Sequence, residues 1–131
     1  MIDVRALVQT TLDTALAPLG VYTFWQKKIE IASDSNPNEY IVFTYGGDGA
    51  ELYADDSPLV ERGYITIKYY FRAEQTETYA KRQVILGRET LIKTSLKNAG
   101  FNIDTGPFDA GDVDDIGFYC TVFECSFSEV V

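Results

Sequence analysis

Residues 64–72, YITIKYYFR, decide the fold class that this chain of 131 residues is expected to adopt. Apolar side chains recur along the stretch with a period of two, which is typical of a β-strand with one core face and one outer face. Such a strand must belong to a sheet that packs against another layer. The expected core face is Ile65, Ile67, Tyr69 and Phe71, and the outer face is Tyr64, Thr66, Lys68, Tyr70 and Arg72.

A long amphipathic helix is predicted to follow this strand and to end near Asn98. Thr76 is the expected N-cap, because a threonine hydroxyl accepts hydrogen bonds from the free backbone N–H groups of a first turn. Gly100 suits the left-handed position after a helix, and Phe101 can then pack back on Leu96, as in a Schellman motif.

The remaining segments predict a single α+β domain over residues 1–131. In it, a mainly antiparallel sheet of about four to six strands packs with an N-terminal helix and the longer central helix. Asp3 is the expected cap of the first helix. That helix is predicted over 3–17, and extended segments are predicted over 21–31, 39–45, 101–104 and 116–129.

Two glycine-rich acidic segments, 46–63 and 105–116, interrupt these elements. The first predicts either a hairpin or a long protruding loop, and no GK[ST] follows its glycines to make a phosphate-binding loop. Neither segment has the ligand spacing of a calcium loop, so solvated acidic loops are favoured over a metal site. Their acidic candidates are Asp48, Glu51, Asp55, Asp56, Asp109, Asp112, Asp114 and Asp115.

The composition argues against catalysis and against nucleic-acid binding. The net charge is −9 and histidine is absent, so phosphate backbones are repelled and the commonest general base is missing. Cys120 and Cys125 would point to opposite faces of one strand, which predicts two free thiols in a reducing compartment. Neither a long apolar run nor a signal-peptide pattern occurs, so a cytosolic protein without a membrane segment is expected. No enzyme activity, cofactor or metal is predicted.

Five side chains are candidates for an interface with another subunit. Tyr64, Lys68, Tyr70 and Arg72 share the outer face of the strand that opens this section. Basic side chains beside aromatic ones can stack single-stranded nucleic acid, but the net charge favours contact with a protein subunit. Trp25 is interpreted as a core anchor, with an interface contact as the alternative.

Four segments, read together, resemble the tail terminator, or tail-completion, proteins of long-tailed bacteriophages. The resemblance covers most of the chain as a pattern of elements and includes no catalytic residues. The segments are the N-terminal helix running into LGVYTFW (19–25), EYIVFTY (39–45) with the acidic segment after it, YITIKYYFRA (64–73) with a helix ending in KNAGF (97–101), and GFYCTVFECSF (117–127).

This resemblance implies a structural protein of the virion tail or neck, assembled in the host cytoplasm. Such proteins form hexameric rings that end polymerisation of the tail tube and dock the tail to the head. The implied partners are further copies of the chain, the tail tube protein and the head-side connector protein. DNA passes through such a ring without specific binding, which an acidic lumen favours.

Within a ring of this kind, the outer sheet face is expected to contact a neighbour and the acidic segments to face the tube or the lumen. The alternative functions are a head-side joining or stopper protein of the neck and, less favoured, a small-ligand-binding α+β domain.

Overall fold

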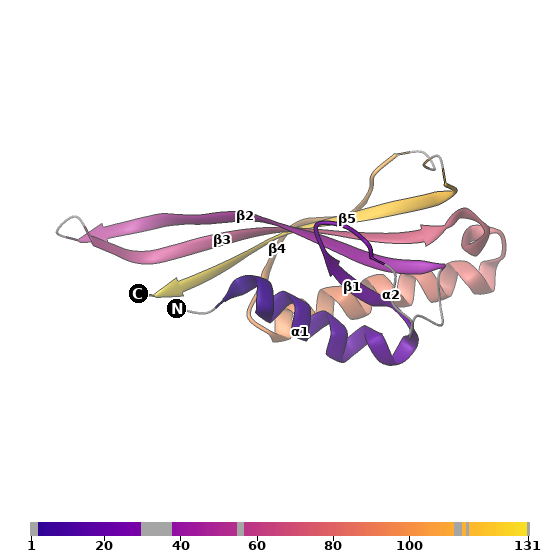
Figure 1. Ribbon diagram of the computed structural model, residues 1–131, viewed down its shortest axis with the longest axis horizontal. Helices are drawn as coiled ribbons and strands as arrows, with labels where there is room; N and C mark the ends of the chain where they lie inside the picture. Colours follow the sequence, from indigo (N-terminus) through magenta and orange to yellow (C-terminus); the bar gives the residue numbers. More distant parts are fainter. Residues whose placement is uncertain (1–2, 30–37, 55–56, 112–113, 115, 131) are drawn as a thin grey trace.

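The computed structural model describes residues 3–29, 38–54, 57–111, 114 and 116–130, and for 47–54, 57–62 and 129–130 it describes the backbone alone. It is a two-layer α+β fold in which both helices lie on one face of a five-stranded sheet, as predicted (Figure 1). The elements in chain order are α1 (Val4–Leu16), η1 (Ala17–Leu19), β1 (Tyr22–Trp25), β2 (Glu39–Ala54), β3 (Ser57–Arg72), η2 (Ala73–Thr76), α2 (Tyr79–Asn98), β4 (Asn102–Asp109) and β5 (Phe118–Val130).

The strands are arranged in the order β1-β2-β3-β5-β4. All neighbours are antiparallel except β1, which pairs in parallel with β2. The parallel pairing is possible because residues 26–38 lie between the two strands and can return the chain to the same end of the sheet. The extended segment predicted over 21–31 is therefore much shorter as a strand, since β1 ends at Trp25 and Gln26 has a positive φ of 68°.

A long hairpin of β2 and β3 projects past the helices (Figure 1). Its pairing runs from Glu39 opposite Phe71 to Ala54 opposite Ser57. Of the two predictions for 46–63, the hairpin is confirmed and the protruding loop is wrong. The strand signal was weak because register shifts interrupt β2 between 45 and 47, 50 and 52, and 52 and 53, and bulges of this kind break the period of two.

The fourth strand was also underestimated from the sequence. A short strand over 101–104 was expected, whereas β4 continues to Asp109 and takes up the first part of the predicted acidic loop 105–116. Two register shifts divide its pairing with β5, and the Cα of Gly106 lies where an added Cβ would approach the Val122 carbonyl oxygen. A glycine and a proline side by side obscure such a strand, because both residues are depleted in strand interiors.

Side chains cap the N-termini of both helices. The Asp3 carboxylate accepts hydrogen bonds from two backbone N–H groups of the first turn of α1, as predicted. The expected cap of α2 at Thr76 is wrong, because Thr78 fills that role by accepting from the backbone N–H of Lys81 at 3.2 Å. Thr76 instead donates to the Ala73 carbonyl oxygen at 2.7 Å, inside the short turn η2.

The C-terminus of α2 is the Schellman motif that the sequence predicted. Gly100 has a φ of 99°, its N–H donates to the Lys97 carbonyl oxygen at 3.1 Å, and the Phe101 N–H donates to the Leu96 carbonyl oxygen at 3.0 Å. The Phe101 ring is buried, and its centroid lies 5.1 Å from that of Phe127. The hydrogen bonds therefore close the end of the helix on itself, and the ring packing holds that end against β5.

The main core lies between the helices and one face of the sheet. The predicted core face of β3 is buried there in full, and the predicted free thiols are confirmed, with Cys125 in the core and Cys120 half-buried on the other face. The helices contribute Val4, Val8, Leu12, Leu16, Ile85, Ile92 and Leu96, and the strands contribute Ile41, Phe43, Ile65, Ile67, Tyr69, Phe71, Phe123 and Cys125.

Candidate functional site

An aromatic cluster lies on the sheet face opposite the helices, and no helix of the described residues covers that face (Figure 1). We call it the outer aromatic cluster. It forms because strand residues of even number in β1, β2, β3 and the start of β5 share this face. Its buried members are Phe24, Tyr40, Val42 and Phe118, and Tyr22 and Tyr70 pack against them.

The rings of this cluster contact one another and two cations. The Tyr40 and Tyr70 rings stack with centroids 4.8 Å apart, and the Phe118 ring meets Tyr40 edge-on at 5.3 Å. The Lys28 ammonium lies 5.1 Å from the Tyr40 centroid, and the Arg72 guanidinium lies 4.7 Å from that of Phe118. Burial, and then the neighbouring Tyr70, raises the pKa of Tyr40 to about 12. Such a surface suits contacts through ring stacking and apolar area rather than proton transfer.

The structure brings the four candidates on β3 to this face but gives them different exposures. Tyr64 is 46% exposed and Lys68 is half-buried, whereas Tyr70 and Arg72 already pack within the outer aromatic cluster. The side chain with the most area left for a partner is therefore Tyr64, together with the exposed Phe108 of β4. Phe108 pairs with Val122 at the edge of the sheet, and the glycine-rich context hid it from sequence reasoning.

Trp25 does not join this face, and its interpretation as a core anchor is wrong. The side chain is 49% exposed at the end of the edge strand β1. The register places it opposite Phe43, and the Arg5 guanidinium of α1 lies 5.1 Å from its ring centroid. An edge strand has a neighbour on only one side, so the last residue of β1 is covered by one arginine instead of a core.

Of the acidic candidates, Asp109 and Asp114 have described side chains, and these two belong to different elements of the fold. Asp114 caps the turn before β5, accepting from the N–H groups of Ile116 at 3.1 Å and Phe118 at 2.8 Å, whereas Asp109 lies at the end of β4. Asp48 and Glu51 belong to β2, but their side chains lie outside the description. Asp55, Asp56, Asp112 and Asp115 lie outside the described residues.

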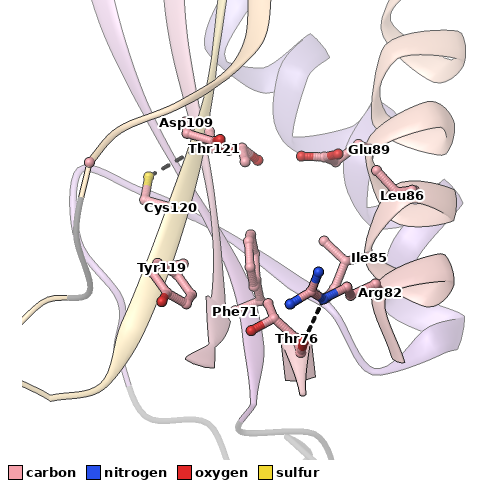
Figure 2. Close-up of a pocket in the computed structure, with 11 residues that line it drawn as sticks. Phe71, Thr76, Arg82, Ile85, Leu86, Glu89, Asp109, Tyr119, Cys120 and Thr121 are labelled. Carbon is pink, nitrogen blue, oxygen red and sulfur yellow. Dashed lines mark hydrogen bonds between the residues drawn. The ribbon is translucent and has the colours of Figure 1, made fainter. Parts of the chain in front are cut away.

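A cleft of about 400 Å³ opens on the helix side, between α2 and the ends of β3, β4 and β5 (Figure 2). Sequence reasoning missed it, because its residues come from four separate segments and carry no motif. The walls carry apolar side chains from both layers and a few polar ones. The lining residues include Phe71, Arg82, Ile85, Leu86, Glu89, Asp109, Tyr119 and Thr121.

Two groups in this cleft are in energetically unfavourable surroundings. Burial raises the pKa of Glu89, and the negative charge of Asp109 raises it further. The Thr121 side chain is 4% exposed, and its hydroxyl has no hydrogen-bond partner within the described part of the chain. A buried hydroxyl without a partner is uncommon and costs stability.

A second buried polar group joins the two layers of the fold. Glu39 opens β2 and is almost fully buried; it accepts a hydrogen bond from the Tyr69 hydroxyl and pairs with Arg88 of α2 at 3.3 Å. Burial, and then Glu39, raises the pKa of Tyr69. Because these groups satisfy one another between the sheet and α2, their role is structural.

The described residues contain neither a cluster of metal ligands nor a membrane-spanning helix. No three side chains of His, Cys, Asp or Glu converge there in a way that could hold a metal ion. None of the helices described is long and apolar enough to cross a membrane.

Comparison with known proteins informs the fold alone. Neither a family model nor a curated protein matches the chain. Among 21 matching chains of known structure, one is similar over 97% of this chain and 95% of its own length, with a TM-score of 0.51 and 10% sequence identity. Its name does not say what that protein does. At this identity the likeness extends to the architecture, and the chain is similar in fold to a solved protein of nearly the same length.

Proposed function

We propose that this protein is a phage tail terminator, a subunit of a ring that ends polymerisation of the tail tube and docks the tail to the head-side connector. The observation that carries the proposal is the sheet itself. One face is covered by both helices, while the other presents aromatic side chains and extends into a long hairpin beyond the helices (Figure 1). A closed ring needs two different patches on each subunit, and the outer face and the projecting hairpin supply two.

The outer face supports the proposal through its chemistry. Tyr64 is about half exposed, and the Tyr40–Tyr70 stack lies further along the same face. Aromatic side chains are enriched at interfaces because they contribute much area for little loss of conformational entropy. The net charge of −9 agrees with a ring through which DNA slides without binding.

The test of ring formation uses two variants with matched exposure. Tyr64→Glu places a charge on the outer face, and Val84→Glu places one on α2, where the wild-type side chain is also 46% exposed. Because a buried unpaired carboxylate is costly, Tyr64→Glu should prevent rings that wild type and Val84→Glu form in the presence of tail tube protein. Light scattering and electron microscopy of the mixture report the rings. Rings that persist in Tyr64→Glu would refute the role of this face.

The test of function uses a deletion of residues 50–58, which removes the outer part of the hairpin and leaves the paired core of β2 and β3. The shortened protein should remain folded by circular dichroism but fail to limit the length of polymerising tail tubes. Tubes of normal length with the shortened protein would contradict the proposal. Binding of the intact protein to the head-side connector, without any effect on tubes, would favour the stopper protein instead.

A further inference from the structure

The cleft beside α2 has the features of a receptor for a cation. Figure 2 shows the Glu89 carboxylate pointing from α2 across the cleft toward Thr121 and Asp109. Within the described residues, neither Glu89 nor Asp109 forms an ion pair, and the nearby Arg88 pairs with Glu39. Arg82, the cation that lines the other end of the cleft, donates through Nε to the Thr76 carbonyl oxygen. Two carboxylates that face one cavity repel each other unless a cation lies between them.

The shape of the cleft favours a cation that carries an alkyl chain. Between the acidic end and the mouth, the walls are formed by the side chains of Phe71, Ile85 and Tyr119. These surfaces suit methylene groups, which a small hydrated ion lacks. A cleft of about 400 Å³ has room for a lysine or arginine side chain.

The rim of the cleft indicates a protein as the source of that side chain. Leu86 lines the cleft and is 52% exposed, and Tyr79, seven residues earlier on the same helix face, is 80% exposed. Exposed apolar side chains beside a charged cavity are typical of contact with a macromolecule. The chain as a whole carries a net charge of −9, which attracts a basic partner.

We propose that this cleft binds a lysine or arginine side chain of a partner protein, with the cationic head between Glu89 and Asp109. The methylenes lie along Phe71 and Ile85, and the partner backbone crosses the rim at Leu86. The Thr121 hydroxyl oxygen, on the wall beside Glu89, accepts a hydrogen bond from the cationic head. This inference stands apart from the proposed ring function, and either can fail without the other.

The experiment is an NMR titration of the whole protein with the peptide acetyl-Gly-Gly-Lys-Gly-Gly-amide and with the same peptide carrying norleucine in place of lysine. The lysine peptide should shift backbone signals around Ile85, Leu86 and Thr121, and the norleucine peptide should not. Glu89→Gln should weaken lysine-peptide binding about tenfold, because one charge-assisted contact is lost. Glu124→Gln is the matched control, since Glu124 is exposed on the opposite face of the sheet.

Three results would overturn the proposal. They are equal shifts from the two peptides, equal affinity of wild type and Glu89→Gln for the lysine peptide, and an absence of shifts at the cleft. A titration with 1,5-diaminopentane separates a free amine from a protein side chain. If the diamine binds at the cleft and the peptide does not, the partner is not a protein. Leu86→Ala should weaken the peptide more than the diamine, because only the peptide crosses the rim.

Discussion

Replacing Arg88 by methionine should destabilise the protein more than any other single charge removal on α2. Arg88 pairs at 3.3 Å with Glu39, whose side chain is 6% exposed, while that of Arg88 is 21% exposed. Arg88→Met keeps the aliphatic packing of the side chain but removes the guanidinium that pairs with a buried carboxylate. Removing one partner of a buried ion pair costs about 3–5 kcal/mol in general.

The expected cost here is somewhat smaller. The Tyr69 hydroxyl continues to donate to the Glu39 carboxylate, and water reaches the arginine side of the pair. We therefore expect a loss of about 2–3 kcal/mol in the free energy of unfolding. With an unfolding entropy of about 2.1 cal/mol/K per residue, the melting temperature should fall by about 9 °C.

The assay is urea denaturation followed by circular dichroism, in a double-mutant cycle with Glu39→Gln. The glutamine keeps an oxygen that accepts from Tyr69 but removes the buried charge, so Arg88→Met should cost less than about 0.5 kcal/mol in that background. Lys81→Met is the control, because Lys81 is exposed on the same helix. The reasoning is refuted if Arg88→Met costs no more than the control, or if its cost is the same with and without Glu39→Gln.

Three further predictions concern stability. Because the folded-state pKa of Glu89 is raised, its ionised form is disfavoured in the fold; Glu89→Gln should therefore be more stable than wild type at pH 7, with a difference that shrinks below about pH 4. An equal difference at both pH values in urea titrations would count against this. Burial raises the pKa of the Cys125 thiol from 9.0 to about 12. The stability that the neutral thiol contributes is therefore full below pH 9 and is lost as the pH rises toward 12. The free energy of unfolding of Cys125→Ala should decline less steeply than that of wild type over this range, and an equal decline would contradict the role of the thiol. Finally, Gly106→Ala should lower the free energy of unfolding by about 2 kcal/mol or more, because φ is 113° and the added Cβ would lie 2.4 Å from the Val122 carbonyl oxygen. Gly87→Ala, where an added Cβ meets nothing within 4 Å, should raise the free energy of unfolding by up to about 1 kcal/mol. Similar melting temperatures for the two variants would contradict this contrast.

Local patterns accounted for the predictions that succeeded. The alternation in 64–72 assigned each side chain of that stretch to the correct face, because successive residues of a strand point to opposite sides. The end of α2 at Gly100 and Phe101 was also predictable, since a Schellman motif depends on residues adjacent in sequence. The failures at this level were also local, since Thr76 and Thr78 have the same capping chemistry two residues apart and the sequence favours neither.

The fold class, the two helices and the division of the central strand into a core face and an outer face follow from the order of the amino acids. The parallel pairing of β1, the continuation of β2 and β3 through a bulged hairpin, and the exposure of Trp25 depend on the folded arrangement. That arrangement also brought Glu39 to Arg88 and assembled the cleft of Glu89, Asp109 and Thr121. The physical reason is the separation in sequence of the residues involved. Periodicity and capping act between near neighbours in the chain, whereas these features depend on which distant segments lie side by side. Bulged or glycine-containing strands also carry little local signal of their pairing.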